Sequence, residues 1–105
     1  MINNERVWVY TQHARRVGGH YEMPGSRGSQ HVDILLDRDL TPFISESDPK
    51  IDLQRMRRFL EDAAQRLFEE GCVTQISHPA GPRWKIVITR ADLGNPTGKA
   101  SNLNF

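Results

Sequence analysis

The sequence predicts an α+β fold in which one long helix packs on a mostly antiparallel sheet of four to five strands, in the order βββαββ. Three observations support this prediction. An amphipathic helix pattern ends at Gly71, two alternating segments joined by a proline- and glycine-containing turn follow it, and two or three strand-like segments precede it. The chain has 105 residues, enough for one hydrophobic core, so we expect a single domain over residues 1–93.

The segments before the helix alternate as strands do. Residues 6–13 read RVWVYTQH, in which β-branched residues alternate with aromatic or polar ones, and residues 31–36 read HVDILL, a mostly apolar strand. Between them, residues 15–30 contain five glycines or prolines. We therefore expect a flexible, basic, glycine-rich loop there, with room for a short strand at residues 19–23.

The helix is the clearest element of the sequence. Asp48 precedes Pro49, as an N-cap precedes a first-turn proline, and Gly71 stands where a left-handed residue commonly ends a helix. Between them, apolar residues recur at spacings of three and four: Leu53, Met56, Leu60, Ala63, Ala64 and Leu67. This spacing places them on one stripe of the helix, which must be covered by the sheet.

Two strands are predicted after the helix, at residues 72–77 and 83–90, joined by the hairpin loop HPAGP at residues 78–82. In the second strand, one face is expected to carry Trp84, Ile86 and Ile88, and the other Lys85, Val87 and Thr89. Residues 94–105 show no periodicity and include Gly94, Asn95, Pro96 and Gly98, so we expect a flexible C-terminal tail.

The composition excludes several classes of protein. Hydrophobic residues make up 37% and charged residues 26%, which is typical of a soluble globular domain. No segment has the roughly 20 apolar residues that span a bilayer, and the first residues lack a secretory signal pattern. We therefore expect a cytoplasmic protein without membrane contact. The single Cys72 excludes an internal disulfide, and the net charge of +1 does not by itself indicate nucleic acid.

The segment from Thr11 to His31 is basic, because it holds three arginines and three histidines against one acid, Glu22. Arginines interleaved with aromatic residues and glycines are typical of contacts with phosphates and unstacked bases, and also of a rim that meets an acidic protein surface. The candidate binding residues are Arg15, Arg16, His20, Tyr21, Arg27 and His31. A second basic patch, nearer the C-terminus, contains Arg83, Lys85, Arg90 and Lys99.

A metal site is the alternative interpretation of the same region. His20 and Glu22 form one His-x-acid pair, and His31 and Asp33 form another. Residues i and i+2 of a strand share a face, so two adjacent strands would assemble two imidazoles and two carboxylates suited to metal-dependent phosphodiester hydrolysis. The spacing matches no known metal motif, and histidine and acidic residues on a polar strand face are the simpler explanation. We therefore assign no metal or cofactor.

A second acidic motif follows the strand at residues 31–36. Asp37 and Asp39 form an Asp-x-Asp pair before the helix, an arrangement that resembles the metal-binding aspartates of small Holliday-junction resolvases. The chain lacks the Asn that follows this pair in those enzymes, and it has Cys72-Val73-Thr74 where their later acidic residues stand. Negative charge before a helix N-terminus has a structural explanation of its own, so we do not assign the chain to that family.

No catalytic motif is complete in this sequence. We therefore expect a small non-enzymatic binding or regulatory module, such as an accessory protein of a larger assembly or a phage-type regulator. The basic segment from Thr11 to His31 is the expected working surface, and its partner is either a protein or a nucleic acid. The alternative is a metal-dependent hydrolase or nuclease that uses His20, Glu22, His31 and Asp33. A homodimer is compatible with either interpretation.

Overall fold

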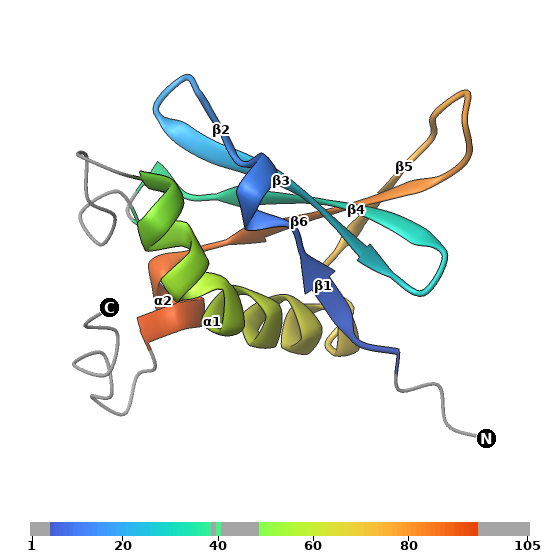
Figure 1. The fold of residues 1–105 in the computed structure, drawn as a ribbon. Helices are drawn as coiled ribbons and strands as arrows, with labels where there is room; N and C mark the ends of the chain where they lie inside the picture. Colours follow the sequence, from blue (N-terminus) through green and yellow to red (C-terminus); the bar gives the residue numbers. More distant parts are fainter. Residues whose placement is uncertain (1–4, 39, 41–48, 95–105) are drawn as a thin grey trace.

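The computed structural model describes residues 5–38, 40 and 49–94, and Figure 1 shows its arrangement. Before the long helix lie β1 (Val7–Val9), the 3-10 turn η1 (Thr11–His13), β2 (Arg15–Val17), β3 (His20–Arg27) and β4 (Gln30–Leu36). The helix α1 (Pro49–Glu69) is followed by β5 (Thr74–Ile76), β6 (Arg83–Ile88) and the short helix α2 (Arg90–Gly94). The predicted α+β fold is confirmed, although the described residues form six strands where four to five were expected.

The strands form one sheet in the order β1-β3-β4-β6-β5, and β2 also pairs with β3. Strand β4 occupies one edge of β3 from Tyr21 to Arg27, so β1 and β2 share the other edge. In that edge, Val9 lies opposite Gly25 and Arg15 lies opposite Glu22. Every pair is antiparallel except β4 and β6, which run parallel because the chain crosses over through α1 between them.

The prediction of a flexible loop over residues 15–30 is wrong, because most of this segment forms β2, β3 and the start of β4. Three of its four glycines are turn residues, and the fourth, Gly25, lies within β3. Gly18 and Gly19 join β2 to β3 and have φ values of 59° and 95°, as a two-residue hairpin turn requires. Gly28, with φ of 62°, sits in the turn between β3 and β4. The strand expected over residues 6–13 is also shorter than predicted. β1 ends at Val9, and the chain forms η1 from Thr11.

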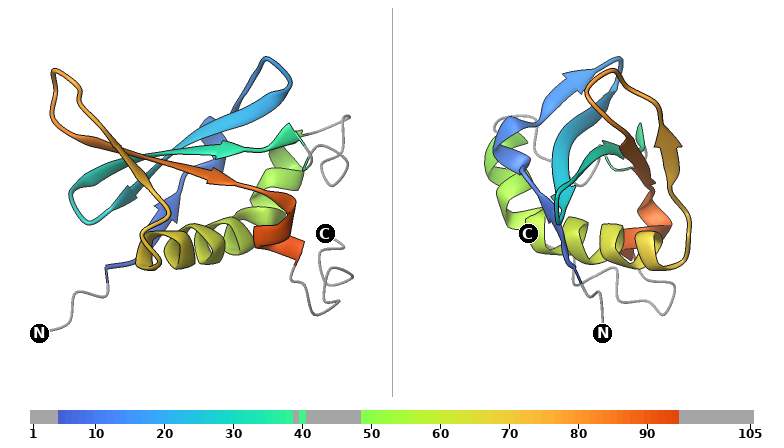
Figure 2. Two further views of the ribbon diagram at one scale, coloured as in Figure 1. Left: turned by 180° about the vertical axis from the view of Figure 1, so that it is seen from behind. Right: turned by 90° about the vertical axis from the view of Figure 1, so that its right-hand side faces the viewer.

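The hydrophobic core lies between α1 and one face of the sheet (Figures 1 and 2). All six residues of the apolar stripe are buried: Leu53, Met56, Leu60, Ala63, Ala64 and Leu67. The sheet contributes alternate residues of its strands: Val7, Val9, Tyr21, Met23, Val32, Ile34, Leu36, Ile86 and Ile88. The predicted stripe and the predicted alternation of the last strand are thus both confirmed.

Both ends of α1 follow from local sequence signals. Pro49 is the first helical residue, as expected, while Asp48 lies outside the described residues. At the other end, Gly71 has φ of 74°, and its N–H donates to the carbonyl of Phe68 at 3.2 Å. The N–H of Cys72 donates to the carbonyl of Leu67 at 2.8 Å. These two bonds form the Schellman motif that closes many helices at a glycine.

The chain after β6 forms α2, which was not expected. Asp92 Oδ2 accepts hydrogen bonds from the backbone N–H of Thr89 at 2.8 Å and from its hydroxyl at 2.9 Å. Leu93 is buried against the core, which anchors this turn of helix. Residues 95–105 of the expected tail lie outside the described residues, so its flexibility stays a prediction.

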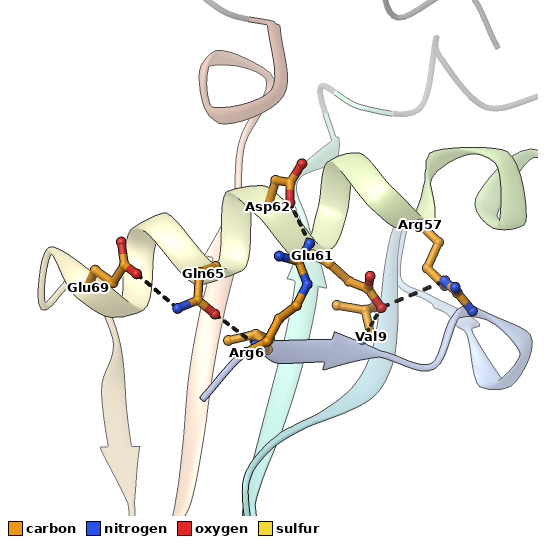
Figure 3. Close-up of polar contacts among 8 residues, drawn as sticks. Arg6, Val9, Arg57, Glu61, Asp62, Gln65 and Glu69 are labelled. Carbon is orange, nitrogen blue, oxygen red and sulfur yellow. Dashed lines mark hydrogen bonds and ion pairs between the residues drawn. The ribbon is translucent and has the colours of Figure 1, made fainter. Parts of the chain in front are cut away.

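The outer edge of β1 is closed by side chains of α1 (Figure 3). The Val7 N–H donates to Gln65 Oε1 at 2.8 Å, and the Val9 N–H donates to Glu61 Oε2 at 3.1 Å. These donors belong to the edge of β1 that faces away from β3, where a sheet would otherwise present free backbone groups. The long helix therefore covers the core and also terminates the sheet at this edge.

Candidate binding surface

The sheet face opposite α1 is not covered by any element in the part of the chain that the structure describes. We call this surface the open face, and it consists of alternate strand residues: Trp8, Arg15, Val17, His20, Glu22, Pro24, Ser26, His31, Asp33, Leu35, Thr74, Ile76, Arg83, Lys85 and Val87. The β2–β3 and β5–β6 hairpins both extend away from α1 at opposite sides of the sheet (Figures 1 and 2). The open face therefore lies between two projecting hairpin tips.

The strand register aligns five side chains in one row across the open face. The row consists of Trp8, Ser26, His31, Arg83 and Ile76, each opposite the next on the neighbouring strand. Neighbouring strands are about 4.8 Å apart, so the row extends for roughly 19 Å. An aromatic ring, an imidazole and a guanidinium thus lie along one line of a rigid sheet.

A hollow of about 450 Å³ lies beside this row. Its polar lining comes from five elements and comprises His13, Arg15, Glu22, Asp33, Arg83 and Lys85. Met23, Pro24, Leu35 and Ile76 supply its apolar lining. The volume lies within the range of small-molecule sites, and the mixture of charged and apolar groups suits a ligand that is itself amphipathic.

The charges of the hollow are partly matched within the protein. Arg83 donates to Asp33 Oδ1 at 2.7 Å. Glu22 lies 3.1 Å from His20 Nε2 and 3.7 Å from Arg15 Nη2. Among the described residues, Lys85 has no carboxylate partner. The open face thus carries the three cations Arg15, Arg83 and Lys85 against two carboxylates, and the ammonium group of Lys85 is available to an external anion.

Two aromatic rings lie at the β1 side of the open face. Trp8 is 49% exposed and Tyr10 is 39% exposed, although both are large side chains that proteins usually bury more fully. The Tyr10 hydroxyl is 2.9 Å from Ser26 Oγ, so its ring is held over the same face as Trp8. Exposed and positioned aromatic rings are characteristic of binding sites.

The strand period of two divides the six candidate binding residues between opposite faces. Arg15, His20 and His31 lie on the open face. The other three lie on the helix side, where Tyr21 is buried in the core.

The two arginines on the helix side stack on aromatic rings. Arg16 Cζ is 5.6 Å from the ring centroid of Tyr21, and Arg27 Cζ is 4.5 Å from that of Phe68. Phe68 in turn packs edge-on against Trp84, with a centroid separation of 5.3 Å. The predicted basic segment therefore does not present one surface, and Arg27 in particular has a structural contact.

The four residues of the metal hypothesis do not converge. His20 and Glu22 do share a face and are in contact, as their spacing predicts. His31, however, lies opposite Ser26, six positions beyond His20 along β3, which corresponds to roughly 20 Å. The described residues contain no group of three or more His, Cys, Asp or Glu side chains placed to hold a metal ion. Asp39, the second residue of the Asp-x-Asp motif, lies outside the described residues.

The sequence identified the cations of β6 only as a separate patch. Arg83 and Lys85 come next to β4 through the parallel pairing, which sets Asp33 opposite Lys85. Alternation along residues 83–88 shows that Lys85 and Val87 share a face, but it does not show which strand lies beside them. Only the non-local register joins the two basic regions into one surface.

Comparison of the chain with protein-family models found no match, and comparisons with curated proteins and with solved structures found none either. No helix within residues 49–94 or elsewhere in the described ranges has the length and apolar character needed to cross a membrane. The class that the fold and surface define is an α+β sandwich with one open sheet face.

Proposed function

We propose that this protein is a non-enzymatic binding module that holds its partner on the open face, between the β2–β3 and β5–β6 hairpins. The observation that supports this most strongly is the concentration of charged and exposed aromatic side chains on one uncovered face of the sheet. Half-covered antiparallel sheets are common, but their exposed faces are usually evenly polar. Here the face includes the 450 Å³ hollow and the exposed ring of Trp8.

The scaffold is suited to such a role because its binding side chains project from strands. The two central strands, β4 and β6, are anchored by the core on their helix side, where Ile34 and Ile86 are fully buried. Side chains on rigid strands lose little backbone entropy when a partner binds, in contrast with side chains on loops. Arginine and tryptophan are also the residue types that contribute most to binding energy at interfaces.

We do not extend the proposal to metal-dependent hydrolysis. The register separates His20 from His31, and Arg83 occupies one oxygen of Asp33. The remaining pair, His20 and Glu22, supplies two groups, fewer than the three protein ligands of a typical catalytic zinc site.

The experiment that tests the proposal compares two charge reversals with identical effects on net charge. Lys85→Glu changes the open face, whereas Arg58→Glu changes an exposed position of α1, on the other side of the sheet. Tagged wild type and both variants are incubated with extract of the native host, and captured proteins and nucleic acids are identified. We expect Lys85→Glu to lose a partner that Arg58→Glu retains. Equal capture by all three proteins would contradict the proposal.

A further inference from the structure

We infer that the partner of the open face is a single-stranded nucleic acid, with Trp8 stacking on a base and Lys85 contacting phosphate. This inference rests on the proposed function, because it names the partner of the same surface. Three observations support it: the surroundings of Trp8, the charge balance of the hollow and the shape of the face.

The residues that follow Trp8 in its row across the sheet are polar. Its neighbour across the sheet is Ser26, followed by His31 and Arg83 in the same row. Tyr10, whose hydroxyl is bonded to Ser26, lies two residues further along the chain. Tryptophan hot spots in protein interfaces are instead enclosed by residues that exclude water. A flat ring with a polar neighbour fits a nucleobase, which stacks on the ring while phosphates further along the strand reach the cations of β6, about 14 Å away at three strand spacings.

The charge balance of the hollow favours a ligand with both anionic and hydrogen-bond donor groups. Lys85 has no carboxylate partner among the described residues, so it is available to a phosphate oxygen. Both oxygens of Glu22 have a cationic or imidazole neighbour, Arg15 or His20, whereas Asp33 contacts Arg83 through Oδ1 alone. Carboxylates of this kind accept hydrogen bonds from the amino groups of bases. A uniformly acidic protein surface would not use these acceptors.

The shape of the face favours a single strand over a duplex. The hairpins flank the face on two sides (Figure 2). The hollow between them is lined by residues of both hairpins, among them Arg15 and Arg83, and its 450 Å³ is enough for a base but not for a duplex. Bases in a duplex are stacked on one another and are not available to an aromatic ring, whereas those of a single strand are.

The inference is tested by fluorescence anisotropy with labelled single-stranded DNA, single-stranded RNA and duplex DNA, each of about 12 residues and mixed sequence, a length within the range of known site sizes. Trp8→Ala should weaken single-strand binding about 5- to 150-fold, the loss expected for one stacked base. Trp8→Phe should retain most of the affinity, because phenylalanine preserves an aromatic face.

The phosphate contact is tested by the salt dependence of the same binding. Lys85→Ala should lower the affinity and reduce the slope of log affinity against log salt by about 0.7, the contribution of one phosphate of a single strand. Arg58→Ala removes the same charge from α1 and should leave both the affinity and the slope nearly unchanged.

Two results would overturn the inference. If the wild type binds neither single strand at about 100 mM salt, the ligand class is wrong. A protein captured from extract by the wild type and lost in Lys85→Glu would then leave the proposed function standing. If Trp8→Ala and Lys85→Ala bind single strands as tightly as the wild type, or if duplex binds more tightly than single strands, the open face is not the nucleic-acid site.

Discussion

Substitution of Glu61 tests how much of the stability depends on the polar junction between α1 and β1. The Glu61 side chain is 3% exposed, and its Oε2 accepts the Val9 N–H at 3.1 Å. In Glu61→Ala this backbone donor loses its acceptor at a buried site. Hydrogen bonds to charged groups contribute about 1.5–3 kcal/mol, so we expect the free energy of unfolding to fall by about 2 kcal/mol. For a domain of this size, that corresponds to a fall in Tm of roughly 8–16 °C.

Urea unfolding followed by circular dichroism measures this loss, with two further variants as references. Glu61→Gln keeps an acceptor oxygen and removes only the charge that faces Arg57 at 3.7 Å, so it should cost less than half as much. Asp62 is also on α1, and Asp62→Ala removes its exposed ion pair with Arg6. This substitution should cost under about 1 kcal/mol. If Glu61→Ala is no more destabilising than Asp62→Ala, the buried acceptor does not stabilise β1 as we argue.

Four further predictions follow from the fold. Leu60→Ala should cost about 2–5 kcal/mol in urea unfolding, since Leu60 is fully buried at the centre of α1; a loss under about 0.5 kcal/mol would contradict the assigned core. Gly25→Ala should displace β1, because its Cβ would lie 2.6 Å from the Trp8 carbonyl oxygen, and a changed Trp8 fluorescence together with a lower Tm would report this. Arg27→Ala should lower stability by about 0.5–2 kcal/mol through loss of its contact with Phe68, and an unchanged Tm would argue against that contact. Deletion of residues 95–105 should leave the Tm nearly unchanged, and a large fall would show that the tail packs on the domain.

The elements that the sequence predicted correctly depend on local periodicity. The stripe on α1 repeats every three or four residues, and Trp84, Ile86 and Ile88 recur at every second position, so each pattern is visible within one segment. The end of α1 at Gly71 is equally local, because the left-handed conformation at that position favours glycine.

The binding surface was harder to predict because it depends on recognising strands and on pairing them. The glycines at residues 18, 19 and 28 were interpreted as flexibility, although each lies in a tight turn. Once β2 is a strand, Arg15 and Arg16 must point to opposite faces, and the predicted basic surface is divided. The parallel contact that brings Lys85 beside Asp33 joins residues 52 positions apart, and no local pattern specifies it.

The contact between α1 and β1 matches the length of β1. Glu61 and Gln65 are four residues apart on the helix, about 6.0 Å along its axis, while Val9 and Val7 are separated by about 6.6 Å along the strand. Two side chains of α1 thus take the place of a neighbouring strand. The acceptors Gln65 and Glu61 run antiparallel to the donors Val7 and Val9, and the two spacings differ by about 0.6 Å.

A third contact with the same spacing would place the Thr11 N–H opposite Arg57. The Arg57 guanidinium offers only donors and therefore cannot accept a hydrogen bond from this N–H. The chain leaves the extended conformation at this residue, where η1 begins. The acceptors that α1 offers to β1 thus end at Glu61, close to the point at which β1 ends and the chain turns toward β2.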